Sequence, residues 1–329
     1  MRVYFDEDAD LGVVRAKKVA VLGYGNQGRA QALNLRDSGV SVLRVALRAG
    51  SASAARAEAE GFAVMTAAAA AAWADVIVML AADEDQAAIY AGDIAPHFRE
   101  DGALIFAHGL NIHFKLIEPQ TKFDIVLVAP KGPGTALRRD YEEGGGLVSL
   151  FAVAQDASGT ARELALAYAA ALGSGRAGII ETSFAEECEA DLFNEAAVLW
   201  GAIPELILAG YETLTEAGFS PEIAYFECVT EVKLIADLIV ERGIAGMREA
   251  ISNTAEFAAL KGGTRIVTAD TRTEMRRILR EVRNGSVAKE LLTDARTGYP
   301  RLQASRATAA SHPIEEVGSK IRGLYRKPS

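Results

Sequence analysis

Four carboxylates recur at helical spacing in the second half of the chain. Asp191 and Glu195 lie four residues apart in DLFNE, and Glu227 and Glu231 have the same spacing in ECVTE. Residues at this spacing project from one face of a helix, where like charges repel unless something offsets them. Carboxylate oxygens are the ligands that Mg²⁺ prefers, so the pairs indicate a divalent-metal site with room for two ions. A solvated acidic helix face is an equal alternative, and it is our interpretation of the neighbouring Glu186, Glu187 and Glu189.

A glycine-rich segment near the N-terminus has the spacing of a dinucleotide-binding turn. The sequence GYGNQG at residues 23–28 follows an apolar run and opens a predicted helix. Glycines at these positions allow a tight turn and a close backbone approach, and the helix N-terminus then faces a pyrophosphate. This context predicts a nucleotide site rather than a structural glycine turn.

The end of the next predicted strand indicates which nucleotide binds. An NAD-dependent enzyme usually carries an acidic residue there for the ribose 2′-hydroxyl. This chain has Arg48, Ser51 and Ser53 instead. A guanidinium and two hydroxyls can bind a 2′-phosphate that a carboxylate would repel. We therefore expect NADPH, against the alternative of a solvated loop with an incidental arginine.

Two further groups follow predicted strands. His108 comes after the strand at 103–107, and Lys131 comes after the strand at 125–129. Ligands of doubly wound sheets bind at the carboxyl ends of parallel strands. A histidine there can transfer a proton near neutral pH, and a lysine can stabilise developing negative charge. We expect both residues to be catalytic.

Strands alternating with helices position these groups. Besides the two strands just named, apolar strands are expected at 17–24, 40–47 and 75–80, with helices between them. That alternation predicts an α/β fold with a Rossmann-type doubly wound parallel sheet. After about Thr182 the strand signals stop and amphipathic helical patterns dominate. We therefore expect a nucleotide-binding domain over 1–182 and an all-helical C-terminal domain over 183–329.

Composition narrows the classes of function. The net charge of −9 argues against a nucleic-acid partner, because phosphate binding favours a basic surface. The two cysteines supply no disulfide framework, so a reducing cytoplasm is expected. The acidic start lacks the layout of a signal peptide, and no apolar run approaches the roughly 18 residues of a membrane span.

Together the motifs resemble the ketol-acid reductoisomerase (acetohydroxyacid isomeroreductase) family in its short bacterial form. The similar segments run almost end to end and include GYGNQG, LRAGSAS, AHGLNIHF, APKGPG, DLFNE and EAGFSPEIAYFECVTEVKLI. The resemblance implies an NADPH- and Mg²⁺-dependent enzyme of branched-chain amino-acid synthesis. It would convert 2-acetolactate into 2,3-dihydroxyisovalerate by alkyl migration and reduction. It also implies a homodimer or higher homo-oligomer, in which Glu227 and Glu231 reach into the partner's site.

The family's site residues carry over by position. The resemblance implies an active-site role for His108, a substrate contact at Ser252, and metal ligation by the four carboxylates. The implied cofactor contacts are Tyr24, Gly25, Asn26, Gln27, Arg48, Ser51, Ser53, Asp83, Glu84, Asp85, Gln86 and Gly134.

The chain departs from the family near the site. Trp200 stands where the family usually has a cysteine beside the substrate pocket, and Arg29 and Gln31 replace two histidines behind the glycine turn. A paralogue acting on another 2-keto acid is therefore one alternative. A metal-independent NADPH-dependent hydroxyacid or imine reductase is a second, and a non-catalytic NADPH-binding scaffold is a third. Magnesium dependence separates the family enzyme and the paralogue from the metal-independent reductase and the scaffold.

Overall fold

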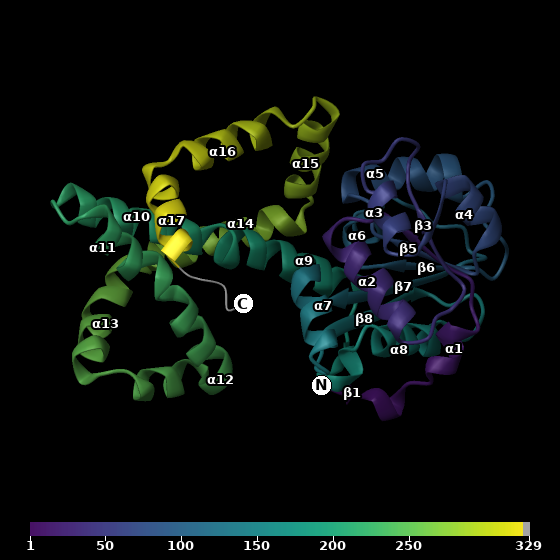
Figure 1. Cartoon of the computed structure of the whole chain (residues 1–329), viewed down its shortest axis with the longest axis horizontal. Coiled ribbons are helices and arrows are strands. Elements are labelled where there is room, and N and C mark those ends of the chain that lie inside the picture. Colours follow the sequence, from purple (N-terminus) through teal and green to yellow (C-terminus); the bar gives the residue numbers. More distant parts are fainter. Residues whose placement is uncertain (325–329) are drawn as a thin grey trace. The chain divides into compact units, whose positions relative to one another are not determined.

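The computed structural model describes residues 1–324, which divide into two compact units (Figure 1). The first unit is Met1–Ala190, and the second begins at Asp191. This division lies inside helix α9 (Phe184–Asn194), slightly beyond the 182/183 boundary that the sequence predicts. The predicted end of the second domain at Ser329 lies outside the described residues.

A nine-stranded sheet forms the centre of the first unit, in the order β1-β9-β8-β7-β6-β5-β2-β3-β4. All neighbours from β7 to β4 in that order are parallel, whereas β8 runs antiparallel to β7, and β1 to β9. The strands are β1 (Val3–Tyr4), β2 (Val19–Leu22), β3 (Leu43–Ala46), β4 (Ala63–Met65), β5 (Val76–Met79), β6 (Ala103–Phe106), β7 (Asp124–Pro130), β8 (Ser149–Gln155) and β9 (Ile179–Glu181).

Alternate side chains of the central strands enter two different cores. On β2, Val19 and Val21 pack on one face with α2 and α8, whereas Ala20 and Leu22 pack on the other face with α4. This period of two is the geometry of a strand buried on both sides, and it confirms the Rossmann-type sheet. The helices of this unit are α1 (Leu11–Arg15), α2 (Asn26–Asp37), α3 (Ala54–Ala59), α4 (Ala67–Trp73), α5 (Asp83–Ile89), α6 (Leu110–His113), α7 (Gly134–Glu142) and α8 (Ala161–Ala171), with 3₁₀ turns at Asp6–Asp8 and Ser174–Arg176 and a π-helical turn at Tyr90–Ile94.

The second unit is helical throughout its described residues, as predicted. A small core joins α10, α11 and α17 through Tyr211, Tyr225 and Ile321. Pro221 opens α11 after Ser220, and α12 is interrupted at Gly243, where φ is 69°. Its helices are α10 (Ala202–Glu216), α11 (Pro221–Tyr225), α12 (Val232–Ala250), α13 (Asn253–Ile266), α14 (Ala269–Arg283), α15 (Ser286–Arg296), α16 (Pro300–Ser311) and α17 (Pro313–Leu324), with π-helical turns at Glu195–Leu199 and Phe226–Thr230.

Large apolar side chains of the second unit remain uncovered in the single chain. Val240 on α12 is 86% exposed and Phe257 on α13 is 66% exposed. Large apolar side chains that a single chain leaves exposed suit an interaction surface. Among the described residues one helical run, Phe184–Glu216, is also long and apolar enough to cross a membrane, which the sequence analysis did not expect. Length and composition alone are weak evidence for a span, and Glu195 and Glu205 lie within the run.

Candidate functional site

The glycine turn has the geometry that the sequence predicts. It joins β2 to α2, and Gly23 has a φ of 103° that favours glycine. A Cβ atom at Gly23 would lie 2.3 Å from the Leu80 carbonyl oxygen, whereas no atom lies within 4 Å of the Cβ position at Gly25. The backbone is therefore tightly packed behind the turn and open at Gly25, which fits a dinucleotide at the N-terminus of α2.

The loop after β3 presents Arg48, Ser51 and Ser53. Arg48 is exposed and forms no ion pair with any residue of the range 1–324. The Ser53 backbone N–H donates to Ser51 Oγ at 3.3 Å, which turns the loop just before α3 begins. An exposed guanidinium beside two hydroxyls suits a phosphate ligand.

The segment Asp83–Gln86 opens α5, and its residues differ in setting. Gln86 is buried, and its amide donates to the carbonyl of Ala81 and to Asp83 Oδ1. Asn111 on α6 donates to the Asp83 carbonyl at 2.9 Å and to Gln86 Oε1 at 3.2 Å. Gln86 therefore holds the loop that joins β5 to α5, while Asp83, Glu84 and Asp85 lie in the first turn of α5.

The loop that carries Lys131 is joined to the glycine turn. Gln27 Nε2 donates to the Gly132 carbonyl at 2.8 Å. A Cβ atom at Gly134 would lie 2.2 Å from the Asn26 carbonyl oxygen, so only glycine fits there. Gln31, one of the departures from the family, donates to Gln27 and accepts from the buried hydroxyl of Tyr168.

His108, Lys131 and Glu187 form one cluster at the carboxyl ends of β6 and β7. Lys131 Nζ lies 2.8 Å from Glu187 Oε1, and His108 Nδ1 lies 3.2 Å from Glu187 Oε2. The Gly109 backbone N–H donates to Glu187 Oε2 at 2.9 Å. The sequence-predicted catalytic residues are thus brought together by a carboxylate whose side chain is 1% exposed.

Glu187 is the member of this cluster that was not predicted from the sequence. We expected it to be solvated like its neighbours, and that expectation is wrong, because the carboxylate is buried and accepts from three groups. Three partners are what a buried charge requires. The available signal was its position four residues before Asp191, which places both on one face of α9.

The cluster holds a proton on His108. Burial lowers the pKa of His108, but hydrogen bonds from its ring to Cys188 and Glu187 and the Glu187 charge outweigh burial and raise the pKa to about 11. Burial acts to raise the pKa of Glu187, yet His108 and Lys131 hold it below its ordinary value. At neutral pH an imidazolium and an ammonium therefore contact the Glu187 carboxylate.

Replacing Glu187 by Gln should lower both the pKa of His108 and the stability of the fold. Removing one member of a buried charge cluster costs about 3 kcal/mol in the free energy of unfolding. Because the folded-state pKa of about 11 exceeds the ordinary 6.5, the His108 contribution is complete below pH 6.5 and is lost as pH rises toward 11. Urea unfolding at several pH values and NMR titration of His108 measure both effects. Glu186 is exposed, so Glu186→Gln is the control. Equal changes in the His108 pKa and in stability for the two variants would contradict the role of Glu187 in the charged cluster.

The predicted metal ligands all lie in the second unit, and Glu195, Glu227 and Glu231 lie at or beside π-helical turns. Glu195 opens one such turn, where the Trp200 N–H donates to the Glu195 carbonyl, and Glu227 lies in the other, which ends before Glu231. Such turns occur frequently at functional sites. Within residues 1–324 no three of the four carboxylates bring ligand oxygens within 4.8 Å of one another. The donor chemistry fits Mg²⁺, but the described part of one chain does not bring the four ligands together.

Ser252, the predicted substrate contact, lies at the N-terminus of α13. Its side chain accepts from the Ala255 N–H at 3.2 Å, so it caps the helix. The residue is exposed in the single chain.

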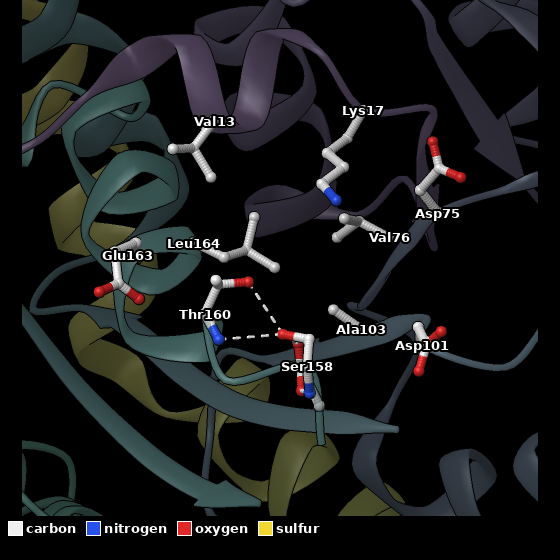
Figure 2. Close-up of a pocket in the computed structure, with 11 residues that line it drawn as sticks. Val13, Lys17, Asp75, Val76, Asp101, Ala103, Ser158, Thr160, Glu163 and Leu164 are labelled. Carbon is white, nitrogen blue, oxygen red and sulfur yellow. Dashed lines mark hydrogen bonds between the residues drawn. The ribbon is translucent and has the colours of Figure 1, made fainter. Parts of the chain in front are cut away.

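One cavity of about 210 Å³ in the first unit lies at the amino edge of the sheet, opposite the edge that carries the glycine turn and His108 (Figure 2). Its lining includes Lys17, Asp75 and Asp101, which precede β2, β5 and β6. Figure 2 shows Ser158 and Thr160 hydrogen-bonded to each other beside it. Nucleotides bind at the opposite edge of such sheets, and none of the predicted site residues lines this cavity.

Comparison with known proteins covers both units. The acetohydroxy acid isomeroreductase NADPH-binding domain matches residues 13–178, and the ketol-acid reductoisomerase C-terminal domain matches residues 184–327. The chain is similar to the solved structure of an NADH-preferring ketol-acid reductoisomerase from an uncultured archean. The two are 43% identical over 99% of this chain and 100% of that one, with a TM-score of 0.96.

More distant structures share the fold alone. A semialdehyde dehydrogenase NAD-binding protein from Cupriavidus necator, in complex with calcium and NAD, is 18% identical over 82% of this chain and 99% of that one, with a TM-score of 0.62. Pyrroline carboxylate reductase from Plasmodium falciparum with NADP bound is 15% identical over 82% of this chain and 98% of that one, with a TM-score of 0.54.

Proposed function

The chain belongs to the ketol-acid reductoisomerase family and is an oxidoreductase with isomerase chemistry, and on that premise we propose that it converts 2-acetolactate into 2,3-dihydroxyisovalerate with NADPH and Mg²⁺. The observation that supports this most is the cluster of His108, Lys131 and Glu187, whose loop is hydrogen-bonded to the glycine turn. This arrangement supplies fixed positive charge beside the predicted nucleotide site.

The chain's own residues act through position and charge. The ammonium of Lys131 and the protonated ring of His108 can stabilise an oxyanion that develops on the substrate. Glu187 orients both and keeps the His108 ring charged. When bound at the four carboxylates, Mg²⁺ would polarise the ketone and acidify the neighbouring hydroxyl, and NADPH would supply the hydride.

The choice of NADPH is supported by the loop after β3. The NADH preference of the archaeal relative makes cofactor choice a question of local residues, not of family membership. Here no acidic residue lies between Leu47 and Ala55, and Arg48 is exposed and without an ion pair in the described chain. These features favour a 2′-phosphate over a 2′-hydroxyl.

A homodimer with a shared site would account for two features of the second unit. The four carboxylates do not converge within one described chain, and large apolar side chains of α12 and α13 are uncovered. A second copy could supply Glu227 and Glu231 to the first and cover the apolar surface. We place this assembly in the cytoplasm, on the basis of the two cysteines and the family.

The substrate assignment is tested by turnover of a panel of 2-keto acids. Purified protein with NADPH and MgCl₂ should convert 2-acetolactate faster than pyruvate, 2-oxobutyrate or 2-oxoisovalerate, with 2,3-dihydroxyisovalerate as the product seen by NMR. Efficient reduction of a simple 2-keto acid without conversion of 2-acetolactate would favour a paralogue with another substrate.

Trp200→Cys should change selectivity between two acetohydroxyacids. Trp200 directly follows the π-helical turn that begins at Glu195, and Trp200 is 66% exposed in the single chain. An indole there would crowd a substrate bound at the Glu195 carboxylate, so the variant should improve the ratio of kcat/KM for 2-aceto-2-hydroxybutyrate over 2-acetolactate by roughly tenfold. Trp200→Phe should give an intermediate ratio. An unchanged ratio would place the indole in a subunit interface instead.

A further inference from the structure

Tyr24, Arg29 and Glu60 form a hydrogen-bonded cluster, here called the Glu60 cluster, behind the glycine turn. The Tyr24 hydroxyl donates to Glu60 Oε2 at 2.6 Å. Arg29 donates to Glu60 Oε1 through Nε at 2.8 Å, and its Nη2 lies 2.7 Å from the same oxygen. The Glu60 side chain is 23% exposed and that of Arg29 is 33% exposed, so water screens this pair only in part.

The Glu60 cluster connects three elements of the cofactor site. Tyr24 belongs to the glycine turn itself, and Arg29 lies in the first turns of α2. Glu60 ends α3, a helix of six residues that begins directly after Ser53. One carboxylate therefore links the turn expected to hold the pyrophosphate to the helix that follows the loop expected to select the nucleotide.

The Tyr24 ring is fixed on its other sides as well. Tyr24 is 3% exposed, and its ring packs edge-on against Phe62 with centroids 5.8 Å apart. Arg36 of α2 donates to the Glu60 carbonyl at 2.8 Å and so connects the end of α3 to α2. Burial and the bond to Glu60 raise the pKa of Tyr24, whereas Arg29 lowers the pKa of Glu60, so the hydroxyl donates to a charged acceptor throughout the neutral range.

We propose that Glu60, held by Arg29, is a positioning residue that fixes the glycine turn through the Tyr24 hydroxyl and thereby sets the affinity for the dinucleotide. The proposal deepens the cofactor site of the proposed function, but it depends neither on metal nor on which nucleotide is preferred. Because the pyrophosphate is common to NADPH and NADH, loss of the contact should weaken both. Arg29 stands where the family usually has a histidine, so the geometry assigns a role to one of the positions at which this chain departs from the family.

The test is a double-mutant cycle on cofactor affinity, read by direct titration of NADPH and NADH without metal or substrate. Tyr24→Phe and Glu60→Ala should each raise the Kd of both nucleotides about tenfold, the size expected when one hydrogen bond to a charged group is lost. The double variant should be no weaker than the weaker single variant, because both changes remove the same contact. Glu60→Gln keeps an acceptor for Tyr24 and should lose less affinity than Glu60→Ala.

Two controls separate positioning from stability and from charge. Arg99→Met breaks the ion pair with Asp75 at the amino edge of the same sheet and should leave both Kd values unchanged. Thermal unfolding of every variant identifies a general loss of stability. Additive effects in the cycle, or a lowered Tm with unchanged Kd values, would overturn the proposal. A loss confined to NADPH would also overturn it, because that result indicates a charge effect on the 2′-phosphate. If the chain does not turn over 2-acetolactate, the proposed function fails, but the Kd values measured without substrate still test the role of Glu60.

Discussion

Asp191→Asn and Glu231→Gln should each abolish conversion of 2-acetolactate while NADPH still binds. Both residues lie in the second unit, whereas the glycine turn and the Arg48 loop lie in the first. A metal ion that polarises a substrate oxygen is worth several kcal/mol, so we expect at least a thousandfold loss of kcat. Product formation followed by NMR and NADPH titration measure the two effects. Glu205→Gln on α10 is the matched control, since Glu205 is exposed and is not a predicted ligand.

The same variants test whether two subunits share a site. Each variant alone should be inactive, but mixed dimers would contain one intact site, so equal mixing and reassembly should restore roughly one quarter of the wild-type activity. No recovery in demonstrated mixed dimers would show that each chain supplies its own four ligands. Full turnover by the unmodified protein in excess chelator would contradict the metal assignment itself.

Ser51→Asp combined with Ser53→Asp should reverse the cofactor preference. Two carboxylates would face a 2′-phosphate, and like charges placed together cost several kcal/mol, so the ratio of kcat/KM for NADPH over NADH should fall at least a hundredfold. The NADH value should change little, because a carboxylate can accept from the ribose 2′-hydroxyl. Ser41→Asp adds charge at the other end of β3 and serves as the control. Equal kcat/KM for both nucleotides in the unmodified enzyme would contradict the NADPH assignment.

The central strands and the glycine turn could be read from the sequence because each leaves a strong local pattern. All five expected strands are present, since β2, β5, β6 and β7 are buried on both faces and so read as continuous apolar runs. The sequence-based prediction missed β1, β4 and β9, whose two or three residues each are too few for a periodic pattern. It also missed β8, although its seven residues are mostly apolar.

Other parts of the site depend on contacts that no local pattern carries. The burial of Glu187 follows from the approach of His108 and Lys131, which are far away in the chain. The π-helical turn at Glu195 is a shift of backbone hydrogen bonds, which composition does not reveal. The spacing of the four carboxylates indicates which residues could bind metal, but the described residues of a single chain do not bring the four carboxylates together.

The metal dependence of two reactions catalysed by the same purified protein tests the proposed reductoisomerase activity most directly. One assay supplies 2-acetolactate and NADPH, and the other supplies the rearranged 2-keto acid and NADPH, each with MgCl₂ and with excess EDTA. We predict that 2-acetolactate is converted only with Mg²⁺, with one NADPH consumed for each 2,3-dihydroxyisovalerate formed. Reduction of the 2-keto acid together with no conversion of 2-acetolactate at any Mg²⁺ concentration would contradict it, because the protein would then be a reductase without isomerase activity.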